Sequence, residues 1–339
     1  MSKAKPTFVI AEAGVNHNGS LDLALRLVDA AKESGADAVK FQTFRAESLV
    51  TRHADKAAYQ QRSVPGGNSQ LEMLRGLELT LSDFEKIQRH CESQEIEFLS
   101  SAFDEDSIHF LDELGMRCFK VPSGEVTNLP LLECIGSLGK PVILSTGMCW
   151  LSEVEMALRA LDEAGAGEIT LLHCVTEYPA PSDQINLAAM ATLRDAFGRP
   201  VGYSDHTAGI EIPVAAVALG AIVLEKHFTL DTQMEGPDHA ASLAPETFRL
   251  MVDSLRNVER AIGDGRKRPA PCELANRELV RRSIATRRAI SAGELIDRDL
   301  LVLKRPGNGL SAECLPLVEG RRARRNIDAD ELLDWQDLS

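Results

Sequence analysis

The stretch PVILSTGMCWLSEVEMALRALDEAGAGEITLLHCV, residues 141–175, contains one complete structural unit. A short apolar run at 141–147 is followed by a turn and by an amphipathic pattern at 151–165, and a second apolar run begins at residue 169. Apolar residues three and four positions apart predict the helix, and the short apolar runs predict strands buried on both faces. The unit is therefore a strand, a crossover helix and a second, parallel strand.

The same alternation runs along most of the chain. The predicted strands are 8–14, 38–44, 97–103, 118–124, 141–147, 169–175, 201–207 and 222–228. Helix patterns lie between them, for example at 20–35, 105–115, 151–165 and 246–263. Eight such units predict an α/β fold closed into a (β/α)₈ TIM barrel. The other arrangement, an open doubly wound sheet, has no GxGxxG turn after a strand in its favour.

The chain has 339 residues, enough for one large domain and a smaller one. We expect a catalytic barrel domain at 1–265, a Pro- and charge-rich linker at 266–278, and a compact β-rich domain at 279–339. The segment 45–80 is too long for an ordinary loop. It predicts extra helix at 70–80 (QLEMLRGLELT), together with a flap over a site at 52–69.

Composition and charge exclude several classes of protein. The net charge of −14 argues against nucleic acid as a ligand. No run approaches the roughly 20 apolar residues of a membrane span. The first apolar run meets Glu12 directly, which predicts a strand rather than a signal peptide. The seven cysteines form no CxxC pair, which indicates free thiols and a cytoplasmic protein.

Active sites of TIM barrels lie at the C-terminal ends of the strands, so the polar residues at those ends are candidates. In strand order they are Glu12, Asn16 and His17; Lys40 and Gln42; Ser100 and Ser101; Lys120, Ser123 and Glu125; Ser145 and Thr146; His173, Thr176 and Tyr178; Ser204, Asp205 and His206; Lys226 and His227. Any one of them alone is compatible with an ordinary buried polar group, but a whole set on one rim indicates a site.

The residue types on this rim suggest a chemistry. Lysines and hydroxyls fit a small anion such as a phosphate ester. His206 and His227, on adjacent strands, can hold a divalent metal; imidazole favours Mn, Co, Fe or Zn, with Mg still open. Glu12 and Glu125 are candidate general bases. His17 is either part of the site or purely structural.

A series of motifs resembles those of the N-acetylneuraminate (sialic acid) synthase family, including the legionaminic acid synthases. The motifs are AEAGVNHNG (11–19), VKFQTF (39–44), FKVPSGE (119–125), LSTGM (144–148), LLHC (171–174) with EYPAP (177–181), GYSDHT (202–207), EKHFTL (225–230), GPDHAAS (236–242) and KRPGNG (304–309). They span almost the whole chain in family order. The C-terminal segment resembles the antifreeze-like (SAF, β-clip) domain of these enzymes.

The resemblance implies an enzyme that condenses phosphoenolpyruvate with an open-chain N-acetylmannosamine-type sugar and water, giving a nine-carbon sialic acid and phosphate. The alternative within the family is N,N'-diacetyllegionaminate synthesis from 2,4-diacetamido-2,4,6-trideoxymannose, and the EYPAP form is similar to those synthases. The resemblance also implies a divalent metal, with Mn²⁺ first and Mg²⁺ or Co²⁺ as other choices. It further implies a homodimer with exchanged C-terminal domains.

Matched motif by motif, the resemblance implies roles for individual residues. The residues implied to hold phosphoenolpyruvate are Lys40, Lys120, Ser123, Ser145 and Ser204. Those implied to contact substrate elsewhere are Gln42, Ser101, Thr176, Tyr178 and Asp238, with Arg305 arriving from a partner subunit. His206 and His227 would bind the metal, and Glu125 would act in proton transfer, with Glu12 as a further catalytic carboxylate. Thr176 stands where some sialic acid synthases have Asn, which leaves its contact open.

Two other functions stay open on the sequence alone. A metal-free aldolase would form a Schiff base on Lys120 or Lys40. A non-catalytic sugar-binding protein would use the C-terminal domain as its binding module, but this gives no reason for lysines and histidines on one rim.

Overall fold

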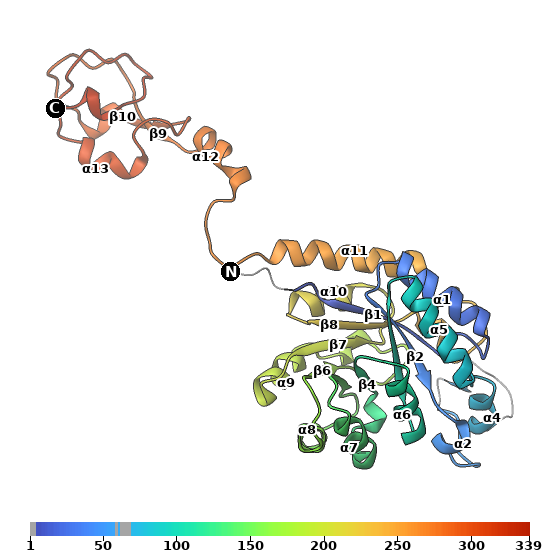
Figure 1. Ribbon diagram of the computed structural model, residues 1–339. Coiled ribbons are helices and arrows are strands. Elements are labelled where there is room, and N and C mark those ends of the chain that lie inside the picture. Colours follow the sequence, from blue (N-terminus) through green and yellow to red (C-terminus); the bar gives the residue numbers. More distant parts are fainter. Residues whose placement is uncertain (1–4, 58–59, 62–68) are drawn as a thin grey trace. The chain divides into compact units, whose positions relative to one another are not determined.

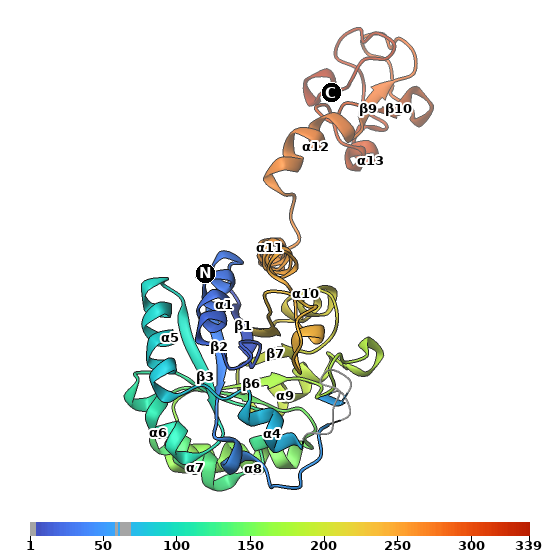
Figure 2. The same cartoon turned by 90° about the vertical axis from the view of Figure 1, so that its right-hand side faces the viewer.

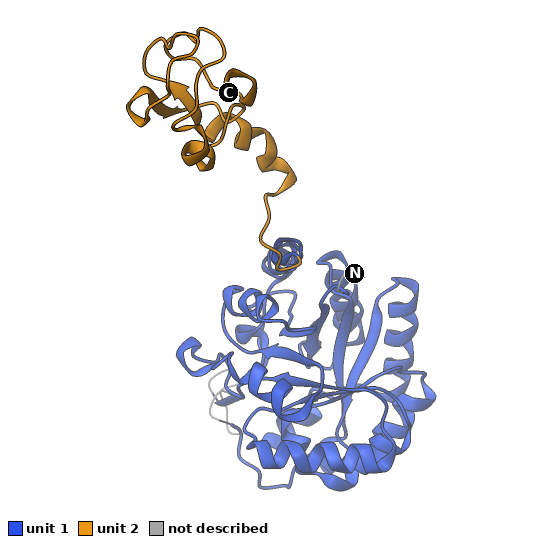
Figure 3. Ribbon diagram, turned by 90° about the vertical axis from the view of Figure 1, so that its left-hand side faces the viewer, with its two compact units in different colours: residues 1–263 blue, residues 264–339 orange. Residues whose placement is uncertain are grey.

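The structure is a computed structural model that describes residues 5–57, 60–61 and 69–339. The chain divides into two compact units, Met1–Gly263 and Asp264–Ser339 (Figure 3), and each has a hydrophobic core of its own. The predicted flap at 52–69 lies partly outside the described residues. Among the described helices, none combines the length and the apolar character needed to cross a membrane. The cytoplasmic location stays a prediction.

Unit 1 is a closed barrel of eight parallel strands in sequential order (Figure 1), so the predicted TIM barrel is confirmed. The strands are β1 (Phe8–Gly14), β2 (Ala38–Thr43), β3 (Glu97–Ala102), β4 (Phe119–Val121), β5 (Val142–Ser145), β6 (Ile169–His173), β7 (Val201–Asp205) and β8 (Val223–His227). β4 is shorter than predicted because Pro122 has no N–H for the strand ladder, and a 3₁₀ turn at Ser123–Glu125 follows it.

Helices surround the strands (Figure 2). They are α1 (Leu21–Glu33), α5 (Leu81–Ser93), α6 (Glu105–Glu113), α7 (Leu129–Ser137), α8 (Leu151–Ala164), α9 (Ala189–Phe197), α10 (Glu211–Ala218) and α11 (Pro245–Ile262). Local sequence sets their ends. The Ser20 side chain caps α1 by accepting a hydrogen bond from Leu23 N. α8 ends at Gly165, whose φ of 99° favours glycine.

Two further helices, α2 (Ala46–Leu49) and α4 (Gln70–Arg75), lie between β2 and β3 in sequence. α4 confirms the first part, 70–75, of the extra helix predicted at 70–80, and residues 76–80 are not helical. Their apolar side chains form a small cluster separate from the main core. Its buried members are Val15, Phe44, Ala46, Leu71, Leu74 and Leu77. The segment therefore has a packed interior of its own beside the C-terminal ends of β1 and β2.

The side chains of each strand alternate between the barrel interior and the surrounding helices. Asp205 of β7 and Lys226 of β8 face outward, where their fully buried side chains form an ion pair. The Lys226 ammonium also donates to Thr207 O, and Tyr203 donates from its hydroxyl to Asp205 Oδ1 at 3.0 Å. The prediction that Asp205 and Lys226 stand on the site rim is therefore wrong, because both face away from the barrel interior.

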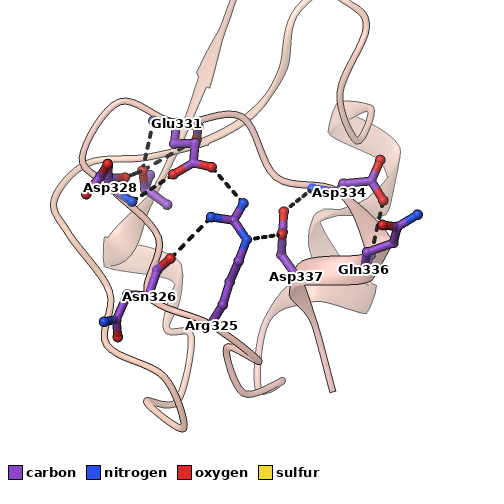
Figure 4. Close-up of polar contacts among 8 residues, drawn as sticks. Arg325, Asn326, Asp328, Glu331, Asp334, Gln336 and Asp337 are labelled. Carbon is purple, nitrogen blue, oxygen red and sulfur yellow. Dashed lines mark hydrogen bonds and ion pairs between the residues drawn. The ribbon is translucent and has the colours of Figure 1, made fainter.

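Unit 2 contains α12 (Leu274–Val280), α13 (Leu315–Val318) and an antiparallel pair of strands, β9 (Ser283–Thr286) and β10 (Leu301–Lys304). Much of its remaining backbone is turns. The Arg325 guanidinium joins two of them, since it donates to Asp337 Oδ1 at 2.7 Å and to Glu331 Oε1 at 2.6 Å (Figure 4). Both carboxylates also accept backbone N–H groups, from Asp334 and Asp328 respectively. Arg325 thus organises a domain with little regular structure.

Candidate active site

A cavity of about 180 Å³ lies at the C-terminal ends of the barrel strands. The predicted site residues that line it are Glu12, Lys40, Gln42, Ser101, Lys120, Ser123, Ser145, Thr176, Tyr178, Ser204, His206, His227 and Asp238. Glu125 is not among the lining residues; its Oε2 accepts a hydrogen bond from Asn128 Nδ2 at 2.7 Å. Arg305 belongs to unit 2. His17 does not line the cavity either.

Two carboxylates and two lysines form a charged cluster in the cavity. Lys40 Nζ lies 2.7 Å from Glu12 Oε2 and 3.6 Å from Glu225 Oε2. Lys120 Nζ lies 3.3 Å from Glu225 Oε1. All four side chains are almost completely buried. Buried charges persist only when they are paired, so the carboxylates hold two cations at the point where an anionic ligand would enter.

Burial and the lysines act in opposite directions on the carboxyl groups. Burial raises the pKa of Glu12 to about 7, although Lys40 opposes this shift. Burial also acts to raise the pKa of Glu225, but Lys120 and Lys40 outweigh it and the pKa is lowered. Burial lowers the pKa of Lys120, whereas Glu12 and Glu225 raise that of Lys40 despite burial. Glu12 therefore keeps a proton up to a higher pH than Glu225 does.

Glu225 is a central residue of the cavity that the sequence analysis missed. Ser204 Oγ donates to its Oε1 at 2.9 Å, in addition to the two lysine contacts. A signal for it was present in the sequence. Glu225 stands two residues before His227, and strand alternation puts both side chains on the same face.

Hydroxyl groups surround the lysines. Ser123 Oγ accepts a hydrogen bond from Gly147 N at 2.8 Å and lies 3.1 Å from Cys174 Sγ. The hydroxyls of Ser145 and Thr176 are buried, and neither has a hydrogen-bond partner in the described part of the chain. Buried hydroxyls normally have partners, so the unused capacity of Ser145 and Thr176 points to a polar ligand.

His206 and His227 lie side by side, with ring centroids 5.4 Å apart. His206 Nδ1 lies 2.6 Å from the Val175 carbonyl oxygen and donates to it, which leaves Nε2 with a free lone pair. His227 Nδ1 is buried and has no hydrogen-bond partner among the described residues. Burial lowers the pKa of both rings, which keeps them neutral, as metal ligands must be. The pair therefore fits a divalent metal.

In the described ranges, no group of three or more His, Cys, Asp or Glu side chains is arranged around a metal position. A metal held by two imidazoles alone keeps several coordination positions for water or substrate, as a catalytic metal requires.

Asp238 and Tyr178 lie on the side of the histidines. The Tyr178 ring centroid lies 4.2 Å from that of His206. Burial raises the pKa of Asp238 to about 6. The loop that carries Asp238 is held by the loop after β1, because Asn16 Nδ2 donates to Ser242 Oγ at 2.9 Å and Ser242 Oγ donates to Asp238 O at 2.6 Å. These hydrogen bonds join the loop after β1 to the loop after β8 and so position Asp238.

A further part of the cavity lining is apolar, and the sequence analysis did not predict it. The side chains are Val15, which follows β1; Met73 and Leu74 of α4; Leu77, just after α4; and Phe103, which follows β3. Seen only as sequence, these residues belong to ordinary amphipathic or strand-end patterns.

Family models match both parts of the chain. The model described as the NeuB family matches residues 27–267, and the SAF domain model matches residues 281–339. The second match confirms the fold predicted for the C-terminal segment.

Several characterised proteins resemble the chain over nearly its full length. It is 49% identical to the N,N'-diacetyllegionaminic acid synthase of Campylobacter jejuni, covering 97% of this chain and 99% of that one. It is 48% identical to the Legionella pneumophila enzyme of the same name, with 98% and 94% covered. It is 38% identical to the human N-acetylneuraminate-9-phosphate synthase, with 97% and 91% covered.

Solved structures agree with this relationship. The N-acetylneuraminic acid synthetase of Leptospira borgpetersenii, in complex with citrate, has a TM-score of 0.71 at 34% identity, covering 80% of this chain and 90% of that one. The spore coat polysaccharide biosynthesis protein spsE of Bacillus subtilis has a TM-score of 0.66 at 35% identity, with 99% and 96% covered.

Proposed function

The chain belongs to the NeuB family, and on that premise we propose that it condenses phosphoenolpyruvate with open-chain 2,4-diacetamido-2,4,6-trideoxymannose and water, giving N,N'-diacetyllegionaminic acid and phosphate. The choice of sugar is supported by the two legionaminic acid synthases, which are 49% and 48% identical to the chain. N-acetylneuraminate synthesis from N-acetylmannosamine is the second candidate, supported by the 34% identical Leptospira structure.

One observation carries the proposed reaction: two buried lysines, and two hydroxyls that have no partner within the described ranges, lie in one cavity with the two histidines. Lys40 and Lys120 supply positive charge for the phosphate and carboxylate of phosphoenolpyruvate. Ser145 donates a hydrogen bond to it, as Ser123 and Ser204 would after exchanging their present partners. The ligand thereby satisfies the Ser145 hydroxyl, which has no partner among the described residues.

The proposed condensation joins C3 of phosphoenolpyruvate to the aldehyde carbon of the sugar. The aldehyde oxygen takes up a proton, and positive charge develops at C2 of the former enol. The carboxylates of Glu12 and Glu225 lie beside the lysines and would stabilise this charge. Water then adds at C2 and loses a proton. The bond between C2 and the phosphate-bridging oxygen breaks, the C2 carbonyl forms, and the hydroxyl proton leaves with the phosphate. Glu12 is the carboxyl group that we assign to proton transfer, because Glu125 does not line the cavity.

His206 and His227 would hold a divalent metal, which supplies polarisation of the aldehyde oxygen. Metal dependence is general in this family, and we propose Mn²⁺ for this chain, with Mg²⁺ or Co²⁺ as alternatives. Gln42, Tyr178 and Asp238 would orient the sugar, and the hydroxyls of Ser101 and Thr176 would donate to the substrates. A Schiff-base aldolase on Lys40 is a weaker reading of the same cavity, because Lys40 is paired with two carboxylates and is a poor nucleophile. On Lys120, whose pKa is lowered by burial, the aldolase is the alternative that borohydride trapping tests.

We also propose that the enzyme is a homodimer with exchanged C-terminal domains, so that Arg305 completes the site of a partner subunit. Arg305 is exposed and forms no ion pair with any residue that the structure describes. The turn that carries it is fixed within unit 2, since Gly307 N donates to Glu278 O at 2.6 Å. A Cβ at Gly307 would lie 2.7 Å from Arg281 Cβ, so the close approach needs glycine.

The proposed function is tested by measuring phosphate release from phosphoenolpyruvate with a panel of acetamido sugars. We expect the diacetamido sugar to exceed N-acetylmannosamine in kcat/KM by about tenfold or more, because a pocket built around a second amide loses at least about 1.4 kcal/mol without it. Equal efficiency would favour the N-acetylneuraminate candidate. Pyruvate trapped on the protein by borohydride, without phosphate release, would favour the aldolase.

A further inference from the structure

The cavity has two chemically different sides. One side is polar and consists of residues at or just after the ends of β6, β7 and β8, namely Thr176, Tyr178, His206 and His227. The other side contains the apolar side chains, which follow β1 or β3 or belong to the segment between β2 and β3. In a closed barrel of eight strands, β2 lies across from β6. The apolar wall is defined as Val15, Met73, Leu74, Leu77 and Phe103. Its members from the β2–β3 segment and from the end of β3 face β6 and β7 across the cavity, whereas Val15 follows β1, which pairs with β8.

The wall is held in place from behind. Val15, Leu74 and Leu77 are each at most 8% exposed and belong to the small cluster with Phe44 and Leu71. An exposed ion pair between Arg75 Nε and Glu47 Oε1 at 2.7 Å also links α4 to α2. The wall is thus a preformed surface, and it does not depend on a ligand for its packing.

No side chain of the wall can donate or accept a hydrogen bond of ordinary strength. A hydroxyl buried against these five side chains would lose its water without gaining a partner from them, whereas a methyl group would gain apolar contact. Gln60, from the same segment, also lines the cavity, and its Oε1 already accepts hydrogen bonds from Ala57 N and Gln70 Nε2. The wall therefore suits a substrate that is polar at its reacting end and lacks oxygen at its other end.

We propose that the apolar wall selects the sugar by its terminal carbon, accepting a C6 methyl group and disfavouring a C6 hydroxymethyl group. This inference rests on the proposed function, in which the aldehyde end lies beside His206 and His227. From there the sugar chain extends across the cavity, and its far end meets Met73 and Leu74. The wall is then the specificity element, and the charged residues perform the chemistry common to both sugars.

The test compares two sugars that differ only at C6, N-acetylmannosamine and 2-acetamido-2,6-dideoxymannose. We expect the wild-type enzyme to prefer the 6-deoxy sugar by about tenfold in kcat/KM, within the range found when an apolar pocket discriminates against a hydroxyl. In Leu74→Asn and in Met73→Gln this preference falls to about twofold or less. The KM for phosphoenolpyruvate is expected to stay unchanged, because Met73 and Leu74 belong to α4 whereas the lysines belong to β2 and β4.

Leu71→Ala and Leu74→Ala form a matched pair. Both residues are buried leucines of α4 in the same small cluster, but only Leu74 lines the cavity. Both variants lower stability, and only Leu74→Ala is expected to change the preference for the sugar. Met73 is half-buried, so Met73→Gln remains informative where Leu74→Asn folds poorly.

The outcomes separate the inference from the proposed function. A wild-type enzyme that turns over the diacetamido sugar best but does not distinguish the two C6 forms overturns the inference alone. So does a preference that persists in both Leu74→Asn and Met73→Gln. Absence of phosphate release with every sugar of the panel contradicts the proposed function itself.

Discussion

The ammonium of Lys40 lies 2.7 Å from Oε2 of Glu12, and both side chains are almost completely buried. Glu225 Oε2 lies 3.6 Å from the same ammonium. Lys40 therefore has a structural role, because it separates two carboxylates that would otherwise repel each other, and a proposed functional role as a cation for the substrate. Two variants separate these roles.

Lys40→Met is expected to lower the free energy of unfolding by about 3–5 kcal/mol, since it leaves the buried Glu12 carboxylate without its counter-charge, whereas Glu225 keeps Lys120. The double variant Lys40→Met/Glu12→Gln restores the balance of charge and should recover most of this loss. Neither variant should release phosphate at more than about 1% of the wild-type rate, because a positioned cation has gone. Denaturant unfolding and the phosphate assay provide the two measurements. A double variant as unstable as the single one would contradict the structural role, and turnover in either would contradict the functional one.

The barrel could be predicted from the sequence because its pattern is local. Each strand is a short apolar run, and each helix has apolar residues at three- and four-residue spacing. The residues at strand ends were predictable for the same reason, since the fold brings them to one rim. Strand alternation, applied more strictly, would have included Glu225 and excluded Asp205 and Lys226.

Other parts of the site depend on contacts that no local pattern contains. Leu74 belongs to a short amphipathic helix, and its position in the cavity wall follows from how the segment between β2 and β3 packs on Val15 and Phe44. Glu125 follows a strand, but Pro122 ends that strand and the next turn directs the carboxylate to Asn128. Both outcomes depend on packing between distant segments or on the geometry of a single turn.

The second prediction concerns the metal. Removal of divalent metals with a chelator should abolish phosphate release, and Mn²⁺ should restore it. His206→Ala and His227→Ala should bind Mn²⁺ at least about tenfold more weakly in calorimetry, because each removes one of two imidazole ligands. His109→Ala, at an exposed position on α6, is the control and should bind as the wild type does. Undiminished Mn²⁺ binding by His206→Ala would refute the assignment of the site.

The third prediction concerns stability at acid pH. His17 is completely buried, its Nδ1 accepts a hydrogen bond from Gly19 N at 3.1 Å, and its Nε2 has no hydrogen-bond partner among the described residues. Burial, with a smaller contribution from His239, lowers the pKa of His17 from 6.5 to about 4. Between these values the unfolded chain binds the proton more tightly, so stability from this group is present above pH 6.5 and is lost as the pH falls towards 4.

His17→Asn keeps an acceptor for Gly19 N but has no titrating ring. Between pH 7.5 and pH 5, the free energy of unfolding of the barrel should fall by about 2 kcal/mol less in this variant than in the wild type, at ~1.4 kcal/mol per pH unit below 6.5. Urea unfolding at the two pH values provides the measurement. His109→Asn is the exposed control and should follow the wild type. If the free energy of unfolding falls equally in His17→Asn and in the wild type, His17 takes up its proton in the folded state as well, and the prediction is wrong.

The last prediction tests whether the active site is shared between two subunits. In a dimer with exchanged C-terminal domains, each site combines the barrel of one chain with Arg305 of the other, whereas without exchange each chain supplies both. Arg305→Ala and His206→Ala should each be inactive alone. When the two are mixed and allowed to exchange subunits, the exchanged arrangement produces one intact barrel with one intact Arg305 in each mixed dimer. Random pairing then restores about a quarter of the wild-type activity, since half of the dimers are mixed and one of their two sites is complete.

Mixing His206→Ala with His227→Ala is the matched control, because both barrels are defective and no arrangement restores activity. Subunit exchange is followed with two differently labelled chains. If exchange is complete and the Arg305→Ala mixture stays inactive, each chain closes its own site and the exchanged dimer is wrong.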